Sequence, residues 1–402
     1  MNSIPVRIEA ARQLQLLLSF QQKTTKKLPT PAAPPLTGRA LANARLLKAA
    51  TERDITGLRL ALEAGADVNA AQGKQGRTAL MLAIRGGSDA VDSGINMREM
   101  ESTWRREGER LGEAMAGEVP AVVAFLLRAG AQVNLPDAVG GTALHYAVAS
   151  GNEGLCRELL RRKANVNAGA ASGLTPLLMA VIRHDPAIVE LLLRAGADPK
   201  NRPLPGHLPL LLLALYQEPA EKGENGGMAS TLRSTMEAMM GGMGGDTSRE
   251  EVVELLLGAG LDPSEAAEEG WTALYMAAEL GSPRIVRRLV AKGARVNAVL
   301  NNGSTPLALA AWSGRADNVR VLLELGANPN ATDKDGDTAL MLAAEKASYA
   351  AVELLLKSGA KAQDRNKKGQ SARDVAARLR HTAIVRLIDA HTAALPSISG
   401  AK

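Results

Sequence analysis

The apolar positions of this chain return in the same order about every 33 residues. In the copy that opens at Thr305, the apolar residues 307, 310 and 311 lie at helical spacing, and a second apolar stripe follows at 319–323. A threonine before Pro306 is typical of a helix start, because the hydroxyl caps free amides and proline at the first helical position loses no hydrogen bond. Gly326 ends the second helix, and a polar turn follows. Each copy is therefore predicted to be helix, turn, helix and short hairpin.

The opening residues of the copies fix the period. They lie one period apart in two runs, Thr142 and Thr175, and then Thr272, Thr305, Thr338 and Ser371. A fixed period between about 20 and 50 residues is the signature of a solenoid, in which each unit is stabilised mainly by its neighbours. The fold class is therefore predicted to be an all-α solenoid with short β-hairpin fingers.

Two phrases identify the repeat. The opening phrase reads Gly-Gly-Thr-Ala-Leu-His at 140–145, and the closing phrase reads Leu-Leu-Arg-Ala-Gly-Ala-Asp-Pro at 192–199. Together with the period, they resemble the ankyrin repeat family. The resemblance implies an array of about nine units over residues 41–392. It says little about function, because this repeat hosts many unrelated recognition tasks.

Two units are longer than the others. Thr78 and Thr142 lie almost two periods apart, as do Leu208 and Thr272, although each pair opens consecutive units. The excess is the same in both and predicts insertions at about 88–118 and 218–248, between the first and second helix of their units. Their methionine stripes, with Trp104 in the first, predict helices. Two interpretations stay open: the insertions present adaptable partner surfaces, or they pack back onto the array. In the second long unit, Leu208-Pro209 replaces the usual Thr-Pro, so that helix start is less certain.

The composition of the chain ends and the distribution of charge limit the classes of partner and the location that we expect. Residues 1–40 are expected to be a disordered basic tail with a Pro-rich linker, and residues 393–402 a flexible tail. The sharper alternative for the first tail is an amphipathic anchor on a membrane or partner. Net charge is +6 overall, +6 within residues 357–389 and negative over residues 41–356. The centre of the array therefore lacks the basic stripe of a nucleic-acid-binding protein. Without a transmembrane or signal segment, the expected location is cytoplasmic.

No pattern indicates catalysis, a metal or a cofactor. The five histidines share no ligand spacing, and no nucleophile elbow, paired-carboxylate phrase or dinucleotide fingerprint occurs. His145 holds the structural histidine position of the family and is expected to hydrogen-bond a neighbouring turn. The single cysteine, Cys156, stands where other units have a core residue, so we expect it to be buried. The chain is expected not to be an enzyme.

The resemblance implies a partner-binding surface on the concave face of the array. Ankyrin repeats vary at the hairpin tips and at the end of the first helix. In the sixth to eighth units the candidate contacts at these positions are Trp271, Glu279, Leu280, Asn301, Asn302, Ser304, Trp312, Ser313, Lys334, Asp335, Asp337 and Glu345. Tyr216 in the fifth unit and Trp104 in the first insertion complete the set. Trp271 and Trp312 are expected to be exposed anchors, because tryptophan is enriched at interface hot spots. The alternative for Trp271 is packing on the adjacent finger.

These observations favour a non-enzymatic scaffold that binds a protein or peptide partner on the concave face. The alternative is a tethered or assembly protein that holds a membrane surface with its basic N-terminal tail. Nucleic acid is not expected as a partner.

Overall fold

The computed structural model describes residues 38–86, 119–170, 173–201, 209–215, 246–280 and 282–394. This part of the chain is mostly helical with little strand, as expected for an all-α repeat solenoid. Contacts between residues divide the chain into two compact units: unit 1 contains residues 1–207 and 218–255, and unit 2 contains residues 208–217 and 256–402.

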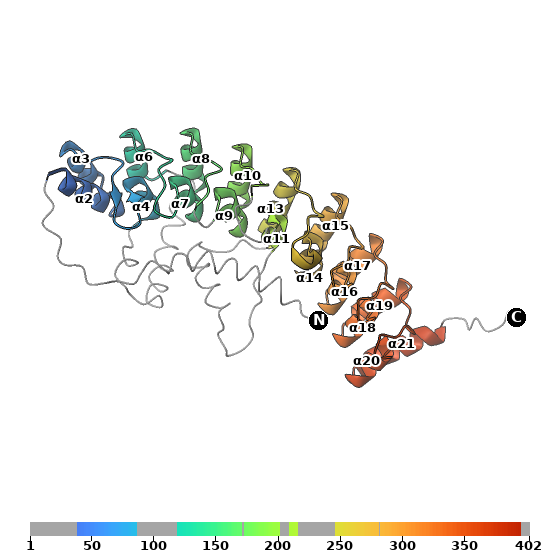
Figure 1. Ribbon diagram of the computed structural model, residues 1–402. Coiled ribbons are helices and arrows are strands. Elements are labelled where there is room, and N and C mark those ends of the chain that lie inside the picture. The colour runs from blue at the N-terminus through green and yellow to red at the C-terminus, as the bar shows by residue number, and fades with distance from the viewer. Residues whose placement is uncertain are drawn as a thin grey trace. The chain divides into compact units, whose positions relative to one another are not determined.

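In unit 1, short helices follow one another in packed pairs with one small sheet between the first two pairs (Figure 1). The pairs are α2 (Gly38–Thr51) with α3 (Ile55–Glu63), α4 (Ala79–Arg85) with α6 (Ala121–Arg128), α7 (Ala143–Ala149) with α8 (Glu153–Arg161), and α9 (Pro176–Ile182) with α10 (Pro186–Arg194). The strands β1 (Ala71–Gln72) and β2 (Arg77–Thr78) pair antiparallel, with Ala71 opposite Thr78.

Unit 2 repeats the same arrangement (Figure 1, yellow to red). It holds α11 (Leu210–Leu215), the 3₁₀ turn η2 (Glu268–Gly270), α14 (Ala273–Leu280), α15 (Pro283–Ala291), α16 (Pro306–Trp312), α17 (Ala316–Glu324), α18 (Ala339–Glu345), α19 (Tyr349–Lys357), α20 (Ala372–Arg378) and α21 (Thr382–Ala394). The residues of α13 (Asp246–Gly258) fall in both units.

The predicted helix starts are confirmed by their caps. The Thr305 hydroxyl accepts a hydrogen bond from the Ala308 amide at 3.2 Å, and Pro306 holds the first helical position. The first helix of the next repeat begins in the same way, because Thr338 accepts from the Met341 amide. The sequence phrase therefore positions each first helix locally.

The core consists of small and branched aliphatic side chains between successive first helices. Leu307, Ala310 and Ala311 are buried on α16, which packs against both α14 and α18. The second helices form a neighbouring layer in which α17 packs between α15 and α19. Alanine-rich faces let these helices lie close together, and this accounts for the few aromatic residues in the chain.

Asparagines in the turns after the second helices connect consecutive repeats. The Asn297 amide group donates to the Gly326 carbonyl at 3.1 Å, and its side-chain oxygen accepts from the Asn328 amide at 2.8 Å. Asn330 makes the same pair of bonds to Gly359 and Lys361. Each asparagine therefore satisfies two backbone groups that would otherwise face water at the end of the next helix.

The predicted domain boundaries fall mainly outside the described residues. The predicted tails lie there except at their inner edges, because α2 begins at Gly38 and α21 ends at Ala394. The first predicted insertion, 88–118, lies outside the described residues, as does the second, 218–248, except for its last residues, which begin α13.

Candidate functional site

The hairpin fingers of unit 2 lie side by side. The Asn301 amide donates to the Glu269 carbonyl at 2.9 Å, and in the next pair the Lys334 amide donates to the Asn302 carbonyl at 2.8 Å. In the last pair the Lys367 amide donates to a carbonyl of the eighth-repeat finger, at 2.9 Å. A continuous backbone ladder therefore fixes the four finger tips relative to one another.

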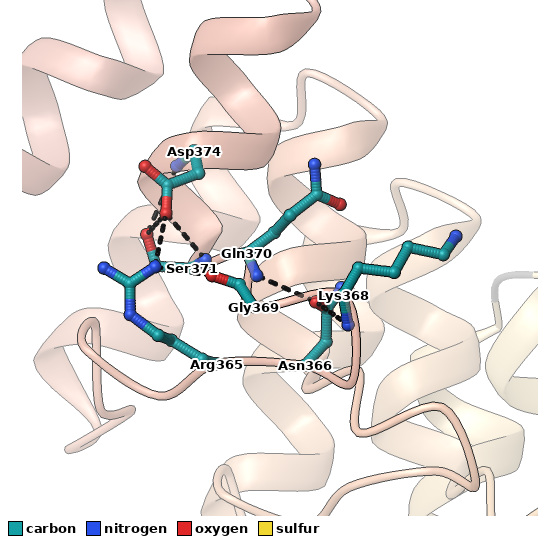
Figure 2. Close-up of polar contacts among 7 residues, drawn as sticks. All are labelled: Arg365, Asn366, Lys368, Gly369, Gln370, Ser371 and Asp374. Atoms are coloured by element: carbon teal, nitrogen blue, oxygen red, sulfur yellow. Dashed lines mark hydrogen bonds and ion pairs between the residues drawn. The ribbon is translucent and has the colours of Figure 1, made fainter.

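The finger tips of the eighth and ninth repeats are also closed from within. The buried Asp333 carboxylate accepts hydrogen bonds from the amides of Asp335 and Asp337, both at 2.9 Å. In the next finger the Asn366 side-chain oxygen does the same for residues 368 and 370, both at 3.0 Å (Figure 2). These bonds make the finger tips a rigid platform rather than flexible loops.

The last finger leads into α20 through a capping box. The Ser371 amide and hydroxyl both donate to the Asp374 carboxylate, at 3.0 and 2.8 Å, and Arg365 lies 3.2 Å from the same oxygen (Figure 2). These hydrogen bonds from Ser371, more than the nearby guanidinium, lower the pKa of Asp374. The Lys368 side chain, in contrast, extends away from this cluster (Figure 2).

We call the finger face the surface of unit 2 formed by the finger tips and the last residues of α14, α16, α18 and α20. Most of the contacts predicted from the sequence reach solvent on this face. Exposed are Asn301, Asn302, Lys334, Asp335 and Glu345, and half-buried are Leu280, Trp312, Ser313 and Asp337. Trp104 and Tyr216 lie outside the described residues.

The expectation that Trp271 is exposed is wrong. Its side chain is only 4% exposed, and its ring packs at a tilt on Tyr275, with the ring centroids 5.8 Å apart. Tyr275 is fully buried and its hydroxyl lies 2.7 Å from the Ala298 carbonyl and 2.9 Å from the Ser304 carbonyl. Trp271 therefore serves the scaffold, and its aromatic contact is with Tyr275 of its own repeat. The position after the turn glycine and the helix position four residues later form one aromatic pair.

Glu279 and Ser304 are also buried, at 6% and 4% exposure, so neither offers its side chain to a partner on this surface. The Glu279 carbonyl accepts a hydrogen bond from the Arg315 guanidinium at 3.3 Å, which ties α14 to the start of α17. The Ser304 amide donates to the side chain of Asn302 at 3.0 Å. Both residues belong to the framework behind the finger face.

Trp312 remains as the partly exposed tryptophan of the finger face. It is the last residue of α16, and the Lys346 ammonium at the end of α18 lies 4.2 Å from the centre of its ring. Such a cation–π contact contributes about 0.5–1 kcal/mol at an exposed site. It holds the indole across two repeats and orients it. The sequence pattern places Trp312 at a variable position, but it does not specify the contact with Lys346.

His145 and Cys156 both serve the scaffold. His145 Nδ1 accepts a hydrogen bond from the Thr142 amide at 3.1 Å, which leaves Nε2 to donate to the Leu174 carbonyl at 3.0 Å. Burial lowers the pKa of His145, so the ring stays neutral. Cys156 is fully buried, and burial raises the pKa of its thiol to about 12. Both interpretations are confirmed.

Within the described ranges, no group of three or more His, Cys, Asp and Glu side chains could hold a metal ion. Among the same residues, no helix has the length and apolar character needed to span a bilayer.

The repeat pattern matches a known family. The family model described as ankyrin repeats (3 copies) matches residues 112–202, 243–333 and 325–395, which together exceed half of the chain. No curated protein matches the sequence.

Proposed function

Because the chain belongs to the ankyrin repeat family, we propose that it is a non-enzymatic scaffold that binds a protein or peptide partner on the finger face of unit 2. Ankyrin repeats are generally protein–protein interaction modules, and proteins built from them are typically not enzymes. The finger face is the surface on which the variable positions of the sixth to ninth repeats converge.

The observation that carries the proposal is the state of Trp312. A tryptophan that served only the core would be enclosed like Trp271, yet Trp312 stays half-buried at the end of α16 with Lys346 over its ring. On the same finger face, Asn301 and Asn302 are polar and exposed. A rigidly held aromatic group within a polar rim is the arrangement of an interface hot spot.

The test is to replace Trp312 and to measure binding and stability separately. Partners are first isolated with the full-length chain and identified by mass spectrometry. Trp312→Ala should then weaken binding of the identified partner about thirtyfold or more, since losing a central anchor costs about 2 kcal/mol. Its unfolding free energy should change by about 1 kcal/mol or less.

Tyr349→Ala is the matched control. Tyr349 is 49% exposed and begins α19, a second helix that is not among the elements defining the finger face. This variant should keep both partner affinity and stability. An identified partner that binds Trp312→Ala as tightly as the unchanged protein would contradict the proposal.

We further propose that the array consists of nine units with two insertions. The helix pairs from α2/α3 to α20/α21 support the count, and the extra length of two of the units falls between α4 and α6 and between α11 and α13. Excising 88–118 or 218–248 and rejoining the ends should leave a folded, helical protein by circular dichroism. If neither excision gives soluble protein, the insertions are structural parts of the core.

A further inference from the structure

Formal charge changes sign along the finger face. In each repeat the face positions are the two residues before the turn glycine, the one after it, and two at the end of the first helix. At these positions the sixth repeat has the exposed acidic residue Glu269 and no basic residue, whereas its Glu279 is buried. The seventh repeat has no charged residue there. The eighth has two basic and three acidic residues. The ninth has three basic residues and no acidic one.

The three cations of the ninth repeat are Lys367, Lys368 and Arg378, and all three are exposed. Lys367 and Lys368 form the tip of the last finger, and Arg378 ends α20. The helix has seven residues and is therefore about 10 Å long. Because the finger joins the start of this helix, the backbone of Arg378 lies about one helix length from the end of the finger.

Two acidic residues near these cations are engaged with other groups, whereas Asp335 of the preceding finger is exposed. Asp374 caps α20 and lies beside Arg365, and Asp389 pairs with Arg373 at 2.6 Å. Both contacts lower the pKa of the carboxylate concerned. Within the described part of the chain, no carboxylate lies within ion-pair distance of Lys367, Lys368 or Arg378.

The platform beneath these cations is ordered. The Lys367 amide bonds to the Asp335 carbonyl of the preceding finger, and the Asn366 side chain donates to the Asp337 carboxylate at 2.7 Å. The backbone that carries Lys367 and Lys368 is therefore held by hydrogen bonds to the preceding finger. A ligand that binds these cations does not have to order this backbone.

We propose that the ninth repeat binds a short acidic segment of the protein partner, rich in Glu or Asp, which continues along the fingers toward Trp312. This inference rests on the proposed function and adds the chemistry and the direction of the partner. An acidic segment would be attracted electrostatically by Lys367, Lys368 and Arg378, and it would be repelled by Glu269 at the far end of the face. The charge gradient thus fixes which end of the partner lies on the last repeat.

A nucleic acid fits this surface less well. Its phosphates carry uniform negative charge, and extension along the ladder would place them against Asp335, Glu345 and Glu269. A protein segment can confine its carboxylates to the one or two repeats where cations stand. We therefore treat nucleic acid and anionic lipid as outcomes that would overturn the proposal.

The probe is a labelled peptide of about twelve residues in which Glu alternates with Ser over one half and Gly alternates with Ser over the other half, so that its carboxylates are confined to one end. An extended chain of this length covers about 40 Å, enough to follow four fingers spaced by about 10 Å. A Lys and Ser peptide of equal length is the comparison ligand. Binding is measured by fluorescence anisotropy on the full-length protein, at about 20 mM and about 150 mM salt, because exposed charge contacts are screened by salt.

The double variant Lys367→Glu, Lys368→Glu should weaken binding of the acidic peptide about tenfold or more at low salt. The matched control is Lys292→Glu, Lys361→Glu, with the same change in net charge. Lys292 caps α15 and Lys361 follows α19; both are exposed and lie away from the finger tips. The control should bind the acidic peptide within about twofold of the unchanged protein, because long-range charge alone is screened.

Three results would overturn the proposal: no binding of the acidic peptide at low salt, equal binding of the basic peptide, or equal loss in the control variant. Tighter binding of anionic vesicles or single-stranded DNA than of the peptide, lost in the Lys367 and Lys368 variant, would also overturn it. Failure here is distinguishable from failure of the proposed function. If Trp312→Ala weakens binding of the isolated partner and the double variant does not, the finger face binds the partner but the acidic-segment inference is wrong.

Discussion

At the scale of single residues, the two tryptophans of unit 2 show where sequence reasoning succeeds and where it stops. Both occupy variable positions, yet Trp271 packs on Tyr275 while Trp312 reaches solvent. The buried faces of α16, including Leu307, follow directly from helical spacing and were predicted. The fate of Trp271 depends on the aromatic residue four positions later. That pairing is visible in the sequence, but its geometry is set by the finger.

Trp271→Ala is therefore expected to reduce stability rather than binding. Removing a large buried aromatic side chain leaves a cavity and costs about 3–5 kcal/mol. Trp312→Ala, at a half-buried site, should cost about 1 kcal/mol or less. Urea unfolding followed by circular dichroism compares the two. Equal midpoints for both variants would show that Trp271 contributes no more to the core than Trp312 does.

At the scale of elements, the hairpin fingers were predicted as turns, but the ladder between them was not. Each ladder bond joins residues almost a full repeat apart in the sequence, such as Lys334 and Asn302, and no local pattern specifies that pairing. Gly303 lies where the ladder is tightest. An added Cβ there would stand 3.1 Å from the Lys334 amide nitrogen, and its φ is +82°.

Gly303→Ala should cost about 2 kcal/mol or more, because left-handed strain adds to a clash with the next finger. Gly314→Ala isolates the strain, since Gly314 also has a positive φ, of +70°, but no atom lies within 4 Å of the added carbon. That control should cost about 1–2 kcal/mol. The measurement is chemical unfolding of both variants. A loss in Gly303→Ala no larger than in the control would mean that the fingers are not closely packed.

The turn carboxylate of the eighth repeat gives a pH prediction. Burial raises the pKa of Asp333, with smaller contributions from nearby carboxylates, while its backbone hydrogen bonds oppose the shift. A folded pKa above the unfolded value of about 4 means that the folded state holds the proton more tightly. The stability from this group is therefore fully present below that unfolded pKa and is lost as pH rises through the raised folded pKa.

Asp333→Asn should remove this dependence, because Asn366 shows that an amide oxygen accepts the same two turn bonds. Relative to the unchanged protein, the variant should gain unfolding free energy between acidic and neutral pH. The reciprocal change, Asn366→Asp, should lower the unfolding free energy over the same pH range, because the new carboxylate stands against the Asp337 carboxylate. Parallel pH profiles for Asp333→Asn and the unchanged protein would refute the assignment.

At the scale of the whole molecule, the period predicts the repeated helix pairs well because each pair is specified by a local phrase. The division into two compact units is not encoded in the period. One of its boundaries falls between residues 207 and 208, where Leu208-Pro209 replaces the Thr-Pro of other repeats, and the others follow residues 217 and 255. The sequence signalled an irregular helix start at this point. What the irregularity does to contacts between repeats depends on packing over many residues, and periodicity does not report that packing.

The last prediction concerns unit 2 alone. In a repeat protein, stability is roughly a sum over repeats and the interfaces between neighbours, so a run of intact repeats should fold without the rest. A fragment of residues 259–402 keeps every helix from α14 to α21 and the packing of α14 on both α15 and α16. It should be helical and unfold cooperatively in urea.

A fragment of residues 283–402 is the matched comparison. It removes α14 and with it the Trp271–Tyr275 pair, which leaves α15 without its first-helix partner and uncovers one face of α16. Its helical circular-dichroism signal should be lower than that of the longer fragment by more than the contribution of α14 itself. The reason is that α15 cannot bury its apolar stripe without its partner helix. Its unfolding midpoint should also be lower. If the longer fragment is unfolded while the full-length chain is folded, the stability of these repeats depends on residues before 259, α11 among them, and the additive description fails.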